Sequence, residues 1–344
     1  MLVTKFSRLK RALLIVGALL TLSVFGVACS SEEEIKPTIR FSDTQFESLW
    51  INNAIAQYVI KHGYGYPVES VSLSTPLMQL ALAEGDVEVN MEMWHQNFIV
   101  NYNEEIAKGS YVNLGPTYEG GPQFFTIPKA TADEYNIVTV QDMKEHWALV
   151  TDPEDSTKGE FQNCPIGWQC AEINRAKLKA YGLLEFFNIK QGGTGAALDA
   201  ALAGAQKKNK PVFGYYWAPT SIMGAYEWTV LEEPPYTEAC WAEVAKGQND
   251  IEYTAKEACA YETLPVDKAV HSSMLEIAPE LVDLLKKMNI GLQPINVTAA
   301  YTSQNFEGEW DKAAIYYLEN YEARWTTWMP EENVKLVKAA LATP

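Results

Sequence analysis

Three tryptophans lie where the chain is about to turn. Trp94 ends the run 87–94, Trp217 ends the apolar run 212–217 directly before an Ala-Pro pair, and Trp168 lies between two closely spaced cysteines. In α/β proteins the ends of strands deliver side chains to ligand clefts. These three rings are therefore candidates for one binding site, and the alternative is that each ring simply packs in the core.

Aromatic rings that face one another across a cleft can hold a methylated cation. Such a cation donates no strong hydrogen bond, but the ring faces attract its diffuse charge at about 0.5 to 2 kcal/mol per ring, and more strongly where water is excluded. Three rings, with water excluded by closure of the cleft, would support micromolar binding, which needs about 8 kcal/mol net. The chain has 10 Trp, 18 Tyr and 12 Phe, so rings are plentiful.

Two polar side chains share strand faces with these tryptophans. Alternation along the run 87–94 places Glu92 on the side of Trp94, where its carboxylate could balance a bound cation. The alternative is a carboxylate that faces solvent or a hinge. In the run 212–217, Tyr215 shares a side with Trp217 and is either a cleft residue or part of the core.

Signatures of catalysis are weak. The four histidines, His62, His95, His146 and His271, are scattered singly, without the spacing of a metal motif or a catalytic triad. The sequence contains neither GxSxG nor a P-loop. We therefore expect no catalysis, no metal and no cofactor. A secreted enzyme that uses cleft carboxylates is the alternative from a different class.

The cysteine count suits an oxidising compartment. Apart from Cys29, the chain has Cys164, Cys170, Cys240 and Cys259, an even set that fits two structural disulfides. Three pairings are open, and the simplest joins neighbours, Cys164 with Cys170 and Cys240 with Cys259. A zinc site fits less well, because the spacing is not CxxC and no histidine lies nearby.

The N-terminus predicts export. Four basic residues precede an apolar run over residues 12–27, as in a secretory signal peptide, with a simple anchor helix as the alternative. Small residues directly before Cys29 resemble the lipobox of bacterial lipoproteins. We expect residues 1–28 to be removed, Cys29 to be lipidated and residues 29–36 to form an acidic tether. The protein would then be extracytoplasmic and anchored to the membrane by lipid.

Composition excludes one class of partner. The chain has 44 Asp+Glu against 27 Lys+Arg, a net charge of -17, and no basic run, so nucleic-acid binding is not expected. With 47% hydrophobic and 21% charged residues it has an ordinary globular composition. A length of 344 residues indicates two domains or lobes. We expect a monomer.

Short apolar runs alternate with amphipathic stretches along the chain. We expect strands near residues 38–41, 68–73, 87–94, 124–128, 148–150 and 212–217, and helices near 47–62, 76–84, 171–181, 195–208, 279–288, 310–320 and 332–341. This pattern favours an α/β fold of two lobes, each a mixed sheet flanked by helices, with a cleft between them. The expected boundaries are 37–127 for the first part of lobe 1, 128–233 for lobe 2, and 234–344 for the return to lobe 1 and the C-terminal helices.

The motifs around the tryptophans resemble the OpuAC-type family, the substrate-binding proteins of ABC importers for glycine betaine, proline betaine and related quaternary amines. The resemblance extends over residues 38–328. It rests on Trp94 after its strand, the loop 164–170 and the segment 212–219, with support from residues 195–198, 278–281 and 325–328. It implies a type II periplasmic-binding fold, a box formed by Trp94, Trp168 and Trp217, and transfer of the ligand to a membrane permease.

The sequence departs from that family where the other end of the ligand would bind. Members that bind betaines often carry a histidine a few residues after the first or third box tryptophan, and neither position matches here. Partial substitutes are available in His95, Asn97 and backbone amides near Gln45, Gly167 and Trp168. Glycine betaine, choline and trimethylamine N-oxide therefore all stay candidate ligands, held in a cage between closing lobes. Another small solute on the same fold is the alternative.

Overall fold

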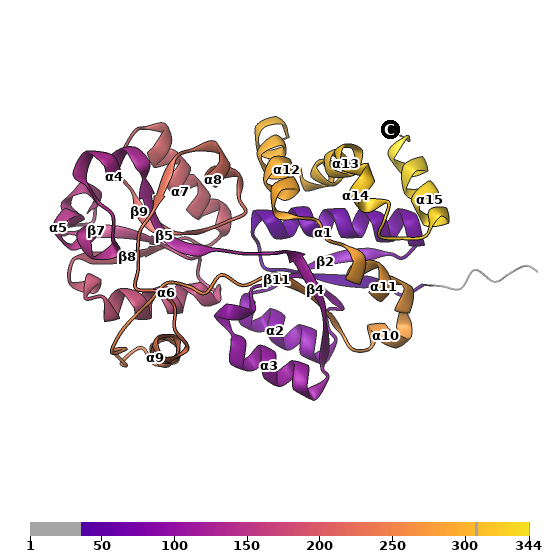
Figure 1. Ribbon diagram of the computed structural model, residues 1–344, viewed down its shortest axis with the longest axis horizontal. Helices are drawn as coiled ribbons and strands as arrows, with labels where there is room; N and C mark the ends of the chain where they lie inside the picture. Colours follow the sequence, from indigo (N-terminus) through magenta and orange to yellow (C-terminus); the bar gives the residue numbers. More distant parts are fainter. Residues whose placement is uncertain (1–35, 307–308, 344) are drawn as a thin grey trace, which may run out of the picture. The chain divides into compact units, whose positions relative to one another are not determined.

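Two mixed β-sheets flanked by helices make up the computed structural model, which describes residues 36–306 and 309–343 (Figure 1). The strand order is β2-β1-β3-β11-β4 in the first sheet and β10-β5-β9-β7-β6 in the second, where β8 also pairs with β7. Each sheet contains parallel and antiparallel pairs. The expected α/β class with two mixed sheets is confirmed. The predicted signal peptide, Cys29 and residues 29–35 of the tether lie outside the described residues.

The first sheet carries the N-terminal and C-terminal parts of the described chain. Its strands are β1 (Ile39–Asp43), β2 (Val68–Ser72), β3 (Val89–Met93), β4 (Tyr111–Tyr118) and β11 (Val266–His271). The helices on this side are α1 (Glu47–Val59), α2 (Thr75–Glu84), α3 (Ile99–Lys108), α10 (Met274–Ile277), α11 (Pro279–Lys287), α12 (Leu292–Asn305), α13 (Trp310–Asn320), α14 (Glu322–Trp325) and α15 (Glu331–Leu341).

The second sheet is built from the middle of the chain. Its strands are β5 (Gln123–Pro128), β6 (Thr151–Asp152), β7 (Asp155–Asn163), β8 (Phe187–Gln191), β9 (Phe213–Trp217) and β10 (Trp228–Val230). Its helices are α4 (Lys129–Tyr135), α5 (Met143–His146), α6 (Gln169–Ala180), α7 (Gly195–Lys207), α8 (Ser221–Ala225) and α9 (Glu238–Asn249). The core under β5, β7 and β9 contains edge-to-face pairs of phenylalanines, such as Phe161 with Phe213.

The chain passes between the sheets from β4 to β5 and returns to the first sheet at β11 (Figure 1). Helix α9, which follows residue 233, packs against α6 of the second sheet. The Arg175 side chain donates a hydrogen bond to the Gly247 carbonyl oxygen over 2.8 Å. A Cβ atom on Gly247 would lie 2.9 Å from the Cβ atom of Ala176, so glycine permits this close approach.

One expected strand is wrong. Residues 148–150 belong to a 3₁₀ turn (Trp147–Val150) that leads into the short strand β6. Three apolar residues are too few to distinguish a strand from a helical turn by periodicity. Several other expected elements agree with the structure within one or two residues, among them α7, α13 and α15.

Both disulfides join neighbouring cysteines, so the structure confirms the simplest of the three pairings. Cys164–Cys170 links the end of β7 to the start of α6, and Cys240–Cys259 ties α9 to the segment that follows it. The first bridge closes the loop that carries Trp168.

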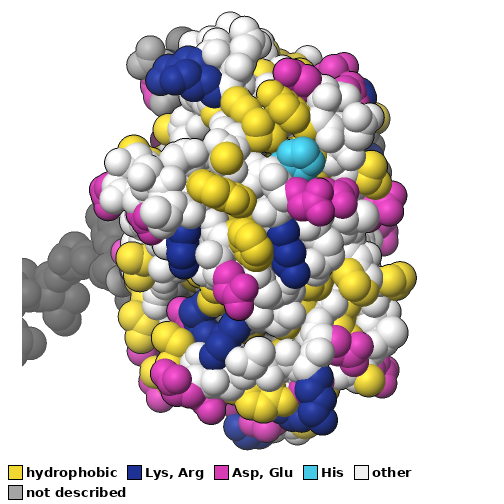
Figure 2. All heavy atoms as spheres, turned by 90° about the vertical axis from the view of Figure 1, so that its left-hand side faces the viewer, with side chains coloured by type: hydrophobic (Ala, Val, Ile, Leu, Met, Phe, Trp, Pro, Cys, Tyr) yellow, Lys and Arg dark blue, Asp and Glu magenta, His cyan; other side chains and the backbone are white. Residues whose placement is uncertain are grey.

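The acidic charge is spread over the surface on the side of the second sheet. Figure 2 shows acidic, basic and hydrophobic side chains interspersed on this face. Among residues 36–306 and 309–343, the helices are too short or too polar to cross a membrane.

Candidate ligand-binding site

Three aromatic rings meet at nearly right angles between the two sheets. The ring centroids of Phe46 and Trp168 are 5.5 Å apart at 81°, those of Phe46 and Trp217 are 6.2 Å apart at 83°, and those of Trp168 and Trp217 are 5.3 Å apart at 77°. All three side chains line a cavity of about 50 Å³. We call this cavity and its lining residues the cage.

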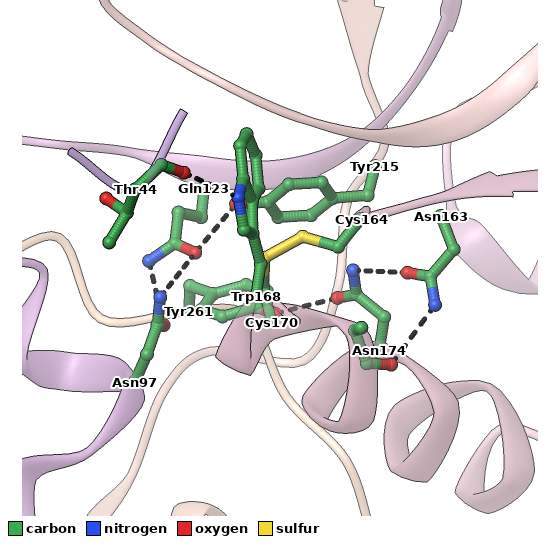
Figure 3. The surroundings of a disulfide bond; sticks show 11 residues. Thr44, Asn97, Gln123, Asn163, Cys164, Trp168, Cys170, Asn174, Tyr215 and Tyr261 are labelled. Carbon is green, nitrogen blue, oxygen red and sulfur yellow. Dashed lines mark hydrogen bonds between the residues drawn. A yellow bond between two sulfur atoms is a disulfide. The ribbon is translucent and has the colours of Figure 1, made fainter. Parts of the chain in front are cut away.

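Trp168 is held on both sides of its ring. Its indole Nε1 donates a hydrogen bond of 2.8 Å to the backbone oxygen of Thr44, which precedes α1 (Figure 3). Gly195 at the start of α7 allows the ring to approach, because a Cβ atom there would lie 3.0 Å from Trp168 Cη2. The disulfide Cys164–Cys170 closes the short loop that carries Trp168. The ring therefore has little freedom to rotate.

Trp217 is supported by its own strand. Tyr215, two residues earlier on β9, lies on the same face and stacks at 6.1 Å and 25°. The Tyr215 hydroxyl donates to Gln123 Oε1 over 2.8 Å, and the amides of Gln123 and Asn97 bond to each other over 3.0 and 3.2 Å (Figure 3). This chain of hydrogen bonds connects the second sheet to the turn that follows Trp94.

Glu92 supplies a buried carboxylate at the cage. Its side chain accepts hydrogen bonds from Asn52 Nδ2 at 2.6 Å, Trp94 Nε1 at 2.9 Å and Ser48 Oγ at 3.2 Å. Burial raises the pKa of Glu92 to about 7, although these donors favour the ionised form. Trp94 also lines the cage, and its ring lies so close to Gly121 that a Cβ atom there would be 2.5 Å from Cζ3.

The charge balance of the cage is one-sided. Among the residues that the structure describes, those lining the cavity include Glu92 but no lysine, arginine or histidine. In the described ranges, His, Cys, Asp and Glu side chains form no group of three that could hold a metal ion. A buried carboxylate without a cationic partner, next to aromatic faces, is complementary to a cation from outside the chain.

The structure brings most of the predicted site residues together, but not all. Trp94, Trp168, Trp217, Glu92, Asn97 and Tyr215 line the cage. His95 instead stacks on Tyr102 at 4.8 Å, with its Nδ1 3.8 Å from Asp267 Oδ2. Gln45 and Gly167 are not among the residues that line the cavity. The Gln45 backbone N–H donates to Asp43 Oδ1, and the Gly167 carbonyl oxygen accepts from the Thr75 N–H.

Phe46 and Gln123 are cage residues that the sequence analysis missed. Phe46 precedes α1, where an apolar residue is usually explained by packing on the helix that it begins. Its neighbour Gln45 has a φ of 67°, a turn that presents the Phe46 ring to the cage and that sequence alone does not reveal. Gln123 begins β5 after a glycine-rich stretch, and its position gives no signal of function.

Hydrogen bonds join residues on the two sides of the cage. Trp168 reaches Thr44, the Thr75 N–H donates to the Gly167 oxygen over 2.9 Å, and the Ser221 N–H donates to Glu47 Oε2 over 2.8 Å. The carboxylate of Glu47 is buried, and this desolvation raises its pKa. The two sides are thus in contact around the cage.

The family model described as the substrate binding domain of ABC-type glycine betaine transport system matches residues 37–320. The glycine betaine/proline betaine-binding periplasmic protein of Escherichia coli (strain K12) is 26% identical over 208 residues, which cover 59% of this chain and 58% of that protein's length. The trimethylamine N-oxide-binding protein of Pelagibacter ubique (strain HTCC1062) is 22% identical over 289 residues, 80% of this chain and 87% of that protein.

Solved structures share the fold. An ABC-transporter choline binding protein in complex with choline has a TM-score of 0.68 at 19% identity, over 89% of this chain and 98% of that one. The glycine betaine, L-proline ABC transporter binding protein of Borrelia burgdorferi has a TM-score of 0.66 at 16% identity, over 87% and 99%. The expected two-lobed periplasmic-binding fold is confirmed by these neighbours, and each sheet with its helices is one lobe.

Proposed function

This chain belongs to the family of substrate-binding domains of ABC-type glycine betaine transport systems, and we propose that it captures a small methylated ammonium compound for import by an ABC permease. The family is one of binding domains for transport rather than of enzymes, and the proposed activity is binding without turnover. Relatives named for glycine betaine, choline and trimethylamine N-oxide support this class of ligand.

The observation that carries the proposal is the pairing of three perpendicular rings with one buried carboxylate. Phe46 comes from lobe 1, and Trp168 and Trp217 come from lobe 2, so the rings surround a ligand only when both lobes contribute. Glu92 lies at the same cavity and supplies negative charge. Methylated cations are attracted to ring faces and to carboxylates without needing to donate a hydrogen bond.

Glu92 favours a cation that has no carboxylate of its own. The carboxylate of glycine betaine would find amide donors in the cage, such as Asn97 and Gln169, but no positive side chain among the described lining residues. Choline presents only its positive head and a hydroxyl group. We propose that choline or a similar cation binds more tightly than glycine betaine at a pH above 7.

Binding would work by a shift between open and closed lobes. A ligand that contacts both lobes stabilises the closed form by its difference in affinity for the two forms. The hydrogen bonds from Trp168 to Thr44 and from Ser221 to Glu47 are the contacts that closing would make. The closed form would then dock on the permease.

A calorimetric titration with glycine betaine, choline and trimethylamine N-oxide tests the proposal. We expect micromolar binding of at least one ligand and a change in tryptophan emission. Trp217→Ala should weaken that binding about a hundredfold or more, since the loss of one desolvated ring with its packing removes several kcal/mol. Trp310→Ala is the matched control, because Trp310 stacks on Trp50 away from the cage. Unchanged affinity in Trp217→Ala would contradict the cage.

We also propose the site of action and the division of the chain. Residues 1–28 would be a signal peptide, Cys29 a lipid anchor and residues 29–36 a tether, so that a monomer works at the outer face of the membrane. Mass spectrometry of the purified protein, compared with Cys29→Ala, would detect the diacylglyceryl mass on the wild-type chain. Because α9 packs against α6, we propose that lobe 2 continues beyond residue 233 to about the start of β11.

A further inference from the structure

The chain crosses from the first sheet to the second through residues 119–122, which join β4 to β5 (Figure 1). We call these residues the crossing segment. It contains two adjacent glycines, Gly120 and Gly121, and neither has a φ in the left-handed region that favours glycine. The backbone conformation would therefore allow alanine at both positions, so any need for glycine must come from the surroundings.

The surroundings of the two glycines differ. A Cβ atom on Gly121 would lie 2.5 Å from Trp94 Cζ3, 2.7 Å from Trp94 Cη2 and 2.5 Å from Val266 Cγ2. In the part of the chain that the structure describes, and apart from adjoining residues, the nearest neighbour of a Cβ atom on Gly120 would be Thr263 Cγ2, at 3.4 Å. Carbon atoms are in ordinary contact at about 3.5 to 4.0 Å, so alanine fits at residue 120 and not at residue 121.

Hydrogen bonds fix the crossing segment next to the Trp94 ring. The Gly121 N–H donates to the Leu264 carbonyl oxygen over 3.0 Å, and the Ala218 N–H donates to the Pro122 carbonyl oxygen over 3.1 Å. Leu264 belongs to the segment that returns to β11, and Ala218 directly follows β9. The backbone at Gly121 is thus tied to both neighbouring segments and cannot move away from Trp94 without straining these bonds.

A methyl group at residue 121 would therefore displace a side chain. Val266 is 0% exposed on β11, which lies between β3 and β4 in the first sheet, so this side chain has no free space to move into. Trp94 lines the cage, whose cavity of about 50 Å³ is free space beside the ring. The ring would have to move by about 1 Å to regain an ordinary carbon–carbon contact. The added methyl group would thus push Trp94 into the cavity.

Trp94 connects the crossing segment to the carboxylate of the cage. The outer edge of its six-membered ring lies against Gly121, while its Nε1 donates to Glu92 Oε2 over 2.9 Å. We propose that Gly121 is a positioning residue for ligand binding, because its lack of a side chain lets the Trp94 ring lie against the crossing segment and leaves room for a fully methylated head. This inference rests on the proposed function and adds the residue that sets the size of the head.

Tetramethylammonium and trimethylammonium, which differ by one methyl group, test this role in calorimetric titrations. Gly121→Ala should lower the affinity for tetramethylammonium relative to trimethylammonium about tenfold, which is the effect of one methyl group in a closely fitting pocket. The smaller cation can turn its N–H toward the displaced ring. A merely structural role of Gly121 would weaken both cations equally and leave the ratio of their affinities unchanged. Gly120→Ala is the matched control and should leave both affinities close to those of the wild type.

The Trp94→Phe background identifies the ring as the group that moves. Phenylalanine keeps an aromatic ring but lacks the Cζ3 and Cη2 atoms that lie against Gly121, so Gly121→Ala should change the affinity ratio little in this background. Circular dichroism shows whether each variant is folded. If Gly121→Ala alone does not fold, the ratio is compared in Val266→Ala with and without Gly121→Ala, because this background removes the second close contact and the ratio should fall there as well.

The outcomes separate the positioning role from the proposed function. An unchanged affinity ratio in Gly121→Ala, or an equal fall in Gly120→Ala, would overturn the positioning role and leave the cage in place. A fall in the ratio that persists in Trp94→Phe would also overturn it, since the ring would not be the group that moves. If neither cation nor glycine betaine binds to the wild-type protein, the proposed function itself is overturned.

Discussion

Two buried carboxylates of this molecule, Glu92 in the cage and Glu233 beside α6, are both close to tyrosine or tryptophan donors and to aromatic rings. Glu233 accepts a hydrogen bond from the Tyr181 hydroxyl over 2.8 Å and pairs with Lys177 Nζ at 2.7 Å. The Lys177 ammonium also lies 4.3 Å from the ring centroid of Tyr261 and 4.7 Å from that of Phe125. We call this cluster the lysine nest.

The nest contains its own cation and the cage does not. Lys177 is fully buried, and desolvation lowers its pKa while the charge of Glu233 opposes that shift. In the cage, the described residues place rings and a carboxylate together but no lysine or arginine. The lysine nest thus shows, within the same chain, the arrangement of rings and carboxylate around a cation that we propose for the ligand.

Because the nest contains its own cation and the cage does not, substitutions at the two sites should affect different properties, stability in the nest and ligand binding in the cage. In the nest, both charges belong to the folded chain, so removing one leaves the other buried and unpaired. In the cage, the carboxylate is already without a cationic partner in the free protein, and the ligand provides one. Substitutions of the nest charges should therefore change the free energy of unfolding, whereas a neutral substitution of the cage carboxylate should mainly change affinity.

Lys177→Met should have the largest effect on stability. It removes the partner of Glu233, whose side chain is 2% exposed, and we expect the free energy of unfolding to fall by about 3 to 5 kcal/mol. Urea denaturation followed by circular dichroism measures the loss. Affinity for the ligand, measured below the unfolding transition, should stay close to that of the wild type.

The double variant Lys177→Met with Glu233→Leu is the control for this comparison. Replacing both charges with apolar side chains of similar size leaves no unpaired ion, so most of the lost stability should return. A double variant as unstable as Lys177→Met alone would show that the packing of the lysine stem, rather than the unpaired carboxylate, determines the loss.

Glu92→Gln should show the opposite pattern. We expect the affinity for choline to fall about tenfold to a hundredfold, because a buried charge interaction is lost while the shape is kept. The free energy of unfolding should stay the same or rise slightly, since burial disfavours the charged carboxylate in the free protein. Calorimetry and urea denaturation on the same samples measure both quantities.

Glycine betaine is the matched ligand for Glu92→Gln. Its own carboxylate already balances its charge, so its affinity should change less than that of choline. Equal losses for the two ligands would mean that Glu92 acts by shaping the cage and not by its charge.

The sequence predicted the parts of the cage that local patterns encode. Trp94 and Trp217 end runs with strand periodicity, and alternation correctly placed Glu92 with Trp94 and Tyr215 with Trp217 on shared faces. The position of His95 directly after Trp94 did not predict where its side chain points. It begins a 3₁₀ turn (His95–Asn97), in which each residue points about a third of a turn away from the previous one, so it faces Tyr102 rather than the cage.

Contacts between distant segments could not be predicted. Lys177 and Glu233 are 56 residues apart, and nothing near either residue marks it as half of a buried pair. A second cavity of about 250 Å³ takes lining residues from α2, α3, α6 and α9, and nothing in the sequence of these four helices indicates that they meet there. The α/β fold class follows from the alternation of strand and helix patterns along the chain. The position of α9 against α6, however, depends on a close contact at Gly247 that only the structure shows.

The smallest expected effect is the pH dependence of choline binding, which tests the cage carboxylate without a substitution in the protein. Burial raises the pKa of Glu92 to about 7, and a bound cation favours the ionised form and so lowers this pKa. Choline stays positively charged throughout. Its affinity should therefore be constant above about pH 8 and weaken as the pH falls through 7, approaching tenfold per pH unit below it.

Other titrating groups must be separated from Glu92 in this experiment. Tyr118, which also faces Glu92, stays neutral because burial raises its pKa well above 10. Burial likewise raises the pKa of Asp199 to about 7, and the charge of the nearby Glu47 adds to that shift. In Glu92→Gln the affinity for choline should no longer change with pH, whereas in Asp199→Asn the pH dependence should remain. If the pH dependence of choline affinity persists in Glu92→Gln but disappears in Asp199→Asn, it arises from Asp199 and lobe closure near Glu47. The charge of Glu92 would then make no contribution to choline binding.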